Sequence, residues 1–144
     1  MSDQPIPDVI DGATIIGAVL QAYAPLLALV DRDSIKGGRL SGDERLPALL
    51  VRTVSVVDRK RLKRSTTRRC TDRVSVTVRA VSWAQQRAVI GLVADAGADR
   101  TGKIGGGLNV SILLAGRGPD VDGPGDTYEQ AQDFRVTYDA LTGA

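Results

Sequence analysis

Regular alternation of apolar and polar residues constrains this chain more than any other feature. The run RVSVTVRA over residues 73–80 places Val or Ala at every even position and Arg, Ser or Thr at every odd one. Successive side chains of a β-strand point to opposite faces, so this run predicts a strand over residues 72–82 with one buried and one solvated face. The same period of two recurs over residues 108–114 and 129–140. Residues 46–57, rich in Val and Leu, are a further strand, and Ile35 begins a short one.

Helical spacing of apolar residues appears between these strands. Residues 15–23 follow the helical period behind Asp11 or Thr14 as a cap, and Pro25 fits the first position of a short second turn over residues 25–30. Ser82 and Gln85 have capping-box spacing for a helix over residues 83–96. The Gly-rich stretches 97–107 and 116–126 are expected to be a connector and a loop.

The order of these segments predicts an α+β fold. We expect a mostly antiparallel sheet of four to five strands with two helices packed on one face. Residues 1–10 are expected to be a flexible lead-in, and residues 11–144 a single domain. Aromatic residues make up only 3% of the chain, so the core must be aliphatic.

The residue counts exclude several kinds of chemistry. The chain has no His and one Cys, Cys70, so His-dependent triads, His-ligated metals and an internal disulfide are excluded. Residues 97–103 spell GxxxxGK, but Ile104 stands where a P-loop needs Ser or Thr, and the segment leaves a helix instead of entering one. The acidic loop 120–126 lacks the spacing of an EF-hand. We therefore expect no enzyme, no cofactor and no metal site.

Membrane association is not expected either. The N-terminal residues MSDQPIPD are acidic, whereas a signal peptide begins with basic residues. The most apolar stretch, residues 13–30, is interrupted by Gln21 and Pro25 and is more typical of helical core than of a membrane span.

Charge is distributed unevenly along the chain. The net charge is +2, but residues 59–73 alone carry +7 and the rest of the chain −5. We expect a long basic loop at about residues 58–72 that contacts either nucleic-acid phosphate, without base stacking, or an acidic neighbouring subunit; a charged loop that orders only against a partner is the third interpretation. The candidate partner- or DNA-facing residues are Arg59, Lys60, Arg61, Lys63, Arg64, Arg68, Arg69 and Arg73.

The order of elements resembles the tail-terminator or tail-completion proteins of long-tailed bacteriophages and gene-transfer agents, the family that includes the minor tail protein U type. Four pieces over residues 13–140 carry the resemblance. They are the amphipathic first helix with its Gly-rich loop, the strand opening LPAL at residues 46–49, the alternating strand that runs into SWA at 82–84, and the closing strand DFRVTY at 133–138. The basic segment 59–73 departs from the family's pattern.

The resemblance implies a structural protein of the virion, assembled in the host bacterial cytoplasm. Such proteins form a ring, usually a hexamer, that caps the tail tube at its head-proximal end, stops its polymerisation and joins tail to head. The implied partners are further copies of the chain, the tail tube protein and the head–tail connector, with non-specific DNA contact in the lumen as a further candidate. Two alternatives stay open: a sequence-nonspecific nucleic-acid-binding module, and another connector or tail-tube component.

Overall fold

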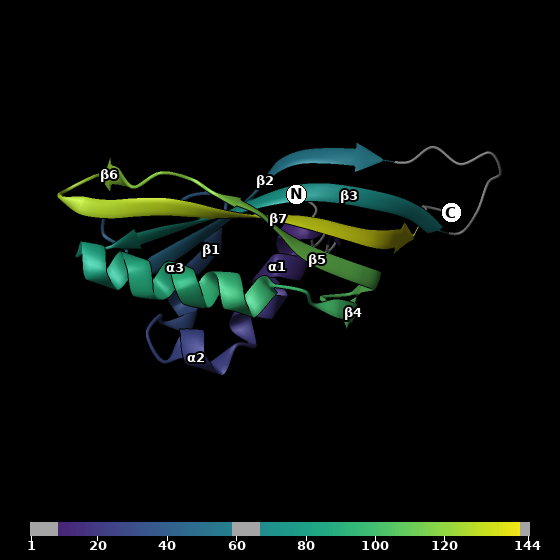
Figure 1. The fold of residues 1–144 in the computed structure, drawn as a ribbon, viewed down its shortest axis with the longest axis horizontal. Coiled ribbons are helices and arrows are strands. Elements are labelled where there is room, and N and C mark those ends of the chain that lie inside the picture. Colours follow the sequence, from purple (N-terminus) through teal and green to yellow (C-terminus); the bar gives the residue numbers. More distant parts are fainter. Residues whose placement is uncertain (1–8, 59–66, 142–144) are drawn as a thin grey trace, which may run out of the picture.

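The computed structural model describes residues 9–58 and 67–141 (Figure 1). Its helices are α1 (Gly12–Gln21), α2 (Ala24–Leu27), the 3-10 helix η1 (Arg32–Ser34) and α3 (Trp83–Gly97). Its strands are β1 (Ile35–Gly37), β2 (Ala48–Asp58), β3 (Thr67–Ala80), β4 (Thr101–Ile104), β5 (Gly107–Arg117), β6 (Val121–Gly123) and β7 (Thr127–Leu141).

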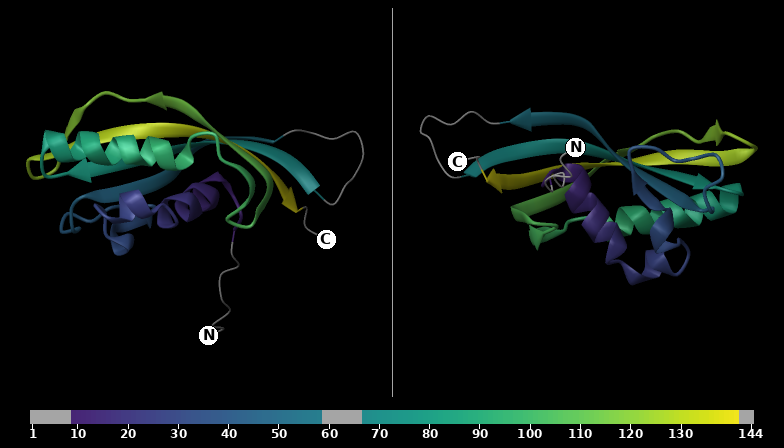
Figure 2. Two further views of the ribbon diagram at one scale, coloured as in Figure 1. Left: turned by 60° about the horizontal axis from the view of Figure 1, so that its bottom comes forward. Right: turned by 180° about the vertical axis from the view of Figure 1, so that it is seen from behind.

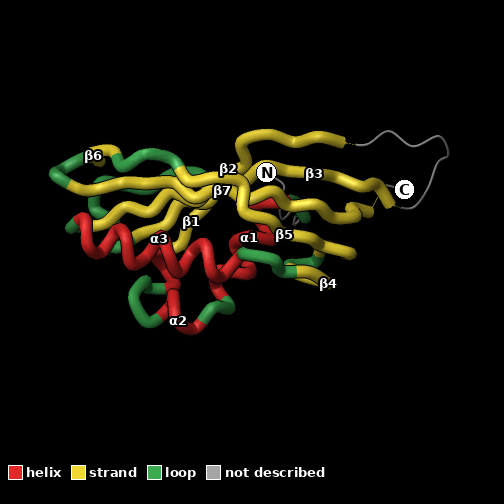
Figure 3. The backbone as a smooth tube through the Cα atoms, in the orientation of Figure 1, coloured by secondary structure: helices red, strands yellow, loops and turns green. Residues whose placement is uncertain are grey.

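All described strands belong to one curled sheet, in the order β1-β2-β3-β7-β5-β4, with β6 also paired to β7 (Figure 3). β1 is parallel to β2, and every other pair is antiparallel. β3 and β7 form the long central pair, which runs from Thr67 opposite Leu141 to Ala80 opposite Tyr128. This pair organises the rest of the sheet, because β2 attaches to one side of it and β5 and β6 to the other.

The alternation in β3 and β7 is confirmed. In β3 the side chains of Val74, Val76, Val78 and Ala80 are fully buried, and in β7 Phe134, Val136 and Tyr138 are buried. The intervening residues of both strands face the other side of the sheet, here called the open face. Since the core is built from these strands and the helices that cover them, it is largely aliphatic, as the composition predicts.

The three α-helices lie on the same side of the sheet (Figure 2). α1 begins at the expected cap, where the Asp11 carboxylate accepts a hydrogen bond from the Thr14 N–H at 2.9 Å. α3 begins at Ser82, whose hydroxyl accepts from the Gln85 N–H at 3.1 Å. Both caps satisfy backbone donors that an α-helix leaves unpaired in its first turn.

The α+β class is confirmed, but the expected four to five strands and two helices are wrong in number. The described residues contain seven strands and three α-helices. β4 lies within the expected connector, where Gly105 and Gly106, both at positive φ, make the two-residue turn of a β4–β5 hairpin. β6 lies within the expected loop and returns to β7 through a tight turn in which Gly125 and Asp126 have positive φ.

The boundaries of the expected basic loop also differ. β2 ends at Asp58 and β3 begins at Thr67, so residues 67–72 belong to a strand and not to the loop. Strand pairing reaches this far because residues 67–72 all pair with β7, and residues 70–72 pair with β2 as well. Residues 59–66 lie outside the described residues.

Candidate functional site

The open face of the sheet carries a row of ion pairs between β3 and β7. The nitrogen–oxygen distances are 3.1 Å for Arg69 with Asp139, 2.9 Å for Arg73 with Asp133 and 2.8 Å for Arg79 with Glu129. Each arginine also donates to a backbone carbonyl: Arg69 to Asn109, Arg73 to Ala115 and Arg79 to Ser41. These contacts tie the central strands to their neighbours.

The eight candidate basic residues therefore fall into three groups. Arg69 and Arg73 are held by carboxylates of the same chain. Arg68 lies exposed on β3. The other five, Arg59, Lys60, Arg61, Lys63 and Arg64, lie outside the described residues. Their contact with a partner or with DNA stays a prediction.

Asp72 lies away from the basic surface. Its carboxylate is fully buried, where Oδ2 accepts from the Gly12 N–H at 2.7 Å and from the Tyr138 hydroxyl at 2.9 Å. The first turn of α1 therefore rests directly on β3 and β7. Gly12 permits this approach, since a Cβ there would lie 2.7 Å from Cβ of Asp72. Asp72 anchors α1 and does not offset the charge of the basic segment at the surface.

β2 and β5 each have a stretch that no described strand pairs with on its outer side, and exposed apolar side chains lie along both stretches. These stretches are here called the free edges. β1 pairs only with residues 49–51 of β2, so beyond Val51 no described strand covers that side of β2. On the opposite side, β4 pairs with β5 only as far as Ser111. The exposed apolar residues at these edges are Val54, Val56 and Val57 in β2, and Leu113 and Leu114 in β5.

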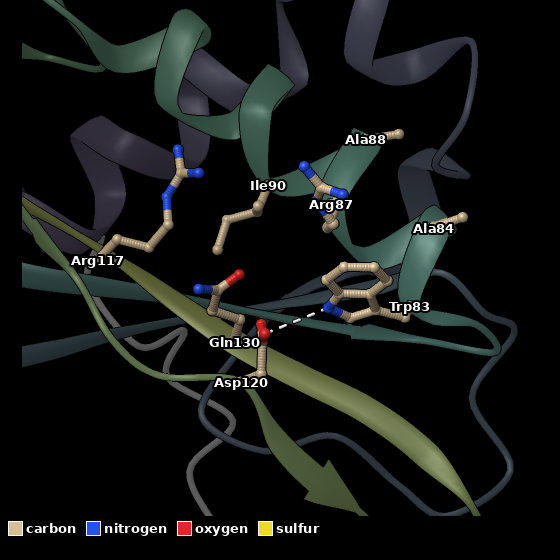
Figure 4. A pocket seen from close by; sticks show the side chains of 8 residues that line it. All are labelled: Trp83, Ala84, Arg87, Ala88, Ile90, Arg117, Asp120 and Gln130. Carbon is tan, nitrogen blue, oxygen red and sulfur yellow. Dashed lines mark hydrogen bonds between the residues drawn. The ribbon is translucent and has the colours of Figure 1, made fainter.

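A hollow of about 530 Å³ lies between the start of α3 and the segment that joins β5 to β6 (Figure 4). Trp83, Arg87 and Ile90 line it from α3, Arg117 and Asp120 from the other side, and Gln130 from β7. The Arg87 guanidinium lies over the indole ring, 4.7 Å from its centroid. This volume is typical of a pocket that takes a small ligand or a few side chains of a partner.

A hydrogen-bond network forms one wall of this pocket. The Asp120 carboxylate accepts from the indole N–H of Trp83 at 3.2 Å and from Nε2 of the fully buried Gln86 at 2.7 Å. Gln86 Nε2 also donates to Gln130, whose own amide donates to the Gly118 carbonyl. The pocket is therefore held in shape by groups from α3, the β5–β6 segment and β7.

The two motifs set aside in the sequence occupy ordinary positions. Residues 97–103 leave α3 and enter β4, which is the reverse of the strand-to-helix order of a P-loop. Asp120 accepts hydrogen bonds in the pocket wall, and Asp126 lies in the β6–β7 turn. Within residues 9–58 and 67–141, no three metal-ligating side chains gather at one place. No helix in the same ranges is long and apolar enough to span a membrane.

Comparison with known proteins shows which family the chain belongs to. The model of the tail completion protein gp17 family matches residues 15–139, from the first turn of α1 to two residues before the end of β7. The chain belongs to this family. As a member of this family, the chain is a structural component of a bacteriophage-type virion tail. The family resemblance of the sequence is confirmed.

A solved structure supports the fold of the tail completion protein. One chain of the virion of a native gene transfer agent (GTA) particle superposes with a TM-score of 0.68 at 19% identity. The alignment covers 90% of the present chain and 95% of that chain. No curated protein sequence matches.

Sequence reasoning missed the pocket and the free edges. The spacing of Trp83 and Arg87, one helical turn apart, was the available signal for the pocket, because residues at i and i+4 face the same way on a helix. Arg117 and Asp120 could not be assigned to it, since only the fold brings the β5–β6 segment to α3. The valines of β2 predict a strand but do not reveal that it borders the sheet.

Proposed function

We propose that this tail completion protein caps the tail tube as a ring at its head-proximal end, stops tube polymerisation and provides the surface that joins tail to head. The match of the family model over residues 15–139 carries the proposal. The function needs shape and contact surfaces, and no catalysis or cofactor.

The free edges supply a way to close a ring. Val56 pairs with Asp72, Asp72 with Val136 and Val136 with Ile112. One row of paired residues therefore crosses the sheet from β2 to β5, and the two free edges lie at its ends. An exposed strand edge offers unpaired backbone groups to another chain. When β2 of one copy pairs with β5 of the next, the contact is heterologous, and repetition with a fixed rotation closes a ring. A hexamer is the number that the family resemblance implies.

The basic segment supplies a second contact region. Five cations at positions 59–64 come directly after Asp58, the last residue of β2, in the sequence. We assign this segment to contact with the tail tube protein or the head–tail connector, with non-specific contact to DNA in the lumen as its further role.

Disruption of the gene in a strain that produces the particles tests this function. Electron microscopy is expected to show separate heads and tails, with tails of irregular length, and expression of the full chain in trans is expected to restore joined particles. Joined particles of normal tail length in the disrupted strain would contradict the proposal.

The basic segment also favours one alternative, a sequence-nonspecific DNA-binding module. That function predicts that the purified protein shifts duplex DNA in gel electrophoresis, and that binding weakens steeply between about 50 and 200 mM salt. A connector or tail-tube component is the other alternative. It predicts particles whose tubes are absent or shortened, in place of the overlong or unjoined tails of a missing terminator.

A further inference from the structure

The pocket at the start of α3 has the side chains of a binding site. Trp83 is the one tryptophan of the chain, and its side chain is 50% exposed. Arg87 stacks on its ring, and the fully buried Ile90 lies beneath the hollow, one turn further along the same helix. Tryptophan and arginine dominate the binding energy of protein interfaces, because both combine a large contact area with a polar group.

The guanidinium groups of Arg87 and Arg117 favour an anionic partner in the pocket. Neither Arg87 nor Arg117 contacts a carboxylate within the described residues, in contrast to the three paired arginines of the open face. Arg117 donates through Nε to Oε1 of Gln132 at 2.9 Å, which fixes its position while both terminal nitrogens stay available. A guanidinium with two such nitrogens binds a carboxylate in bidentate fashion.

Asp120 does not satisfy these arginines. Its two oxygens accept from Trp83 and Gln86 in the pocket wall. The carboxylate therefore positions the indole ring and leaves both guanidinium groups for a ligand. It also adds a negative charge beside the hollow, which disfavours a polyanion such as a nucleic-acid backbone more than it disfavours a single carboxylate.

The pocket lies beside the C-terminal end of β3. Trp83 follows the end of β3, whereas residues 59–66 precede its beginning. A strand of 14 residues spans roughly 45 Å at the usual rise per residue. The pocket thus lies at the end of β3 opposite to the end where that strand begins.

We propose that the pocket formed by Trp83, Arg87 and Arg117 is a docking site for a short acidic segment of a neighbouring virion protein. One or two Asp or Glu side chains bind the guanidinium groups, and an apolar side chain of the same segment packs on the exposed part of the Trp83 indole. That the neighbour is a virion protein rests on the proposed function, whereas the acidic chemistry of the ligand rests on the pocket alone.

Peptide binding to the purified full-length protein tests the chemistry. The probe is a fluorescein-labelled, C-terminally amidated peptide of sequence ELELE, and its matched control is QLQLQ with the same label. Fluorescence anisotropy at moderate salt is expected to show saturable binding of the acidic peptide and at least about tenfold weaker binding of the control, since charge-assisted hydrogen bonds are lost.

Variants locate the binding. Arg87→Gln and Arg117→Gln are each expected to weaken acidic-peptide binding about tenfold or more. Arg52→Gln removes the same charge from an exposed position on β2 and is expected to leave binding unchanged. Equal weakening by all three variants would show that only net charge matters, and would overturn the site.

Two further outcomes would also overturn the proposal. One is the absence of saturable binding by the acidic peptide. The other is binding of a labelled 20-base-pair DNA duplex that displaces the peptide from wild type and is itself weakened by Arg87→Gln and Arg117→Gln but not by Arg52→Gln, which would make the ligand a phosphate. Because the assay uses isolated protein, its failure leaves head–tail joining untouched, and failure of joining leaves the peptide result untouched.

Discussion

Asp72 shows how a single charged residue is placed by the parity of its strand. Position 72 has the same parity as Val74, Val76 and Val78, all of which are buried, so its side chain also enters the core. The sequence therefore contained the signal that Asp72 belongs to the interior. Its partners could not be predicted, because Gly12 and Tyr138 are about 60 residues away on either side.

Tyr138→Phe tests this buried contact. Burial and the hydrogen bond to the Asp72 carboxylate raise the pKa of Tyr138 above its usual value. The variant keeps the ring but removes a donor from a buried carboxylate, so we expect it to lose about 1–3 kcal/mol of stability at pH 8. Urea unfolding followed by circular dichroism measures this loss.

The same variant has an expected pH dependence. The unfolded chain ionises Tyr138 near the usual tyrosine pKa of about 10, while the folded chain keeps it neutral, so this contribution is present below pH 10 and is lost as the pH rises above it. The gap between wild type and Tyr138→Phe should therefore narrow between pH 9 and pH 11. A constant gap over that range would show that Tyr138 is not held neutral by the fold.

At the scale of single elements, glycines decide how closely α3 approaches the sheet. Gly97 ends the helix against Phe134 of β7, where an added Cβ would lie 2.9 Å from Cζ of the ring and closer still to Cε1. Gly91, in the same helix, has no atom within 4 Å of the position a Cβ would take. Both residues look alike in the sequence, and only the packing distinguishes them.

Ala substitutions at these two positions should have opposite effects. Gly97→Ala forces the fully buried Phe134 ring to move and is expected to destabilise the protein by about 1–3 kcal/mol. Gly91→Ala is expected to stabilise it by about 0.5–1 kcal/mol, because Ala has the higher helix propensity. Thermal unfolding of the two variants measures both changes; destabilisation of equal size would show that the approach of α3 to Phe134 does not limit position 97.

Elements with a strong period were predicted, and those that depend on turns were not. β3, β7 and α3 follow from alternation and capping. The predicted ends of β7 and α3 lie within two residues of the observed ones, whereas β3 begins five residues earlier than expected. β4 and β6 are three or four residues long and too short to show a period. Their signal lay in the glycines that follow them, since Gly105 and Gly106 allow a two-residue hairpin turn.

At the scale of the whole molecule, the concentrated positive charge covers fewer residues than the segment 59–73 that the sequence indicates. Arg69 and Arg73 are paired within the chain, and Asp72 is buried. Positions 59–64 therefore carry the concentrated charge that a partner could bind. The sequence located this segment but could not tell which of its cations the sheet itself uses.

Neutralising part of this segment tests its role. The combined change Arg61→Gln, Lys63→Gln and Arg64→Gln is expected to reduce the yield of joined particles at least about tenfold, because charge contacts with tube, connector or DNA are lost. The control removes three exposed cations elsewhere, with Arg39→Gln, Lys103→Gln and Arg135→Gln. Counting joined particles by electron microscopy compares the two; equal yields would remove the segment from head–tail joining.

The last prediction concerns the free edges, because the proposed ring closes through them. Val56 on β2 and Leu114 on β5 are both about half exposed, so a Lys at either position costs little in the monomer. A lysine at a strand edge opposes pairing with another strand, because its charge would be desolvated at the contact. Val56→Lys and Leu114→Lys should therefore each prevent ring assembly, although the two positions lie toward opposite edges of the sheet. Val81→Lys is the matched control, a valine 59% exposed that lies beyond the end of β3 and outside any strand. Complementation of the disrupted strain, with rings and joined particles counted by electron microscopy, measures the effect. Normal particles from either edge variant would exclude the β2–β5 contact, and loss of particles with the control as well would trace the defect to solubility instead of the edge.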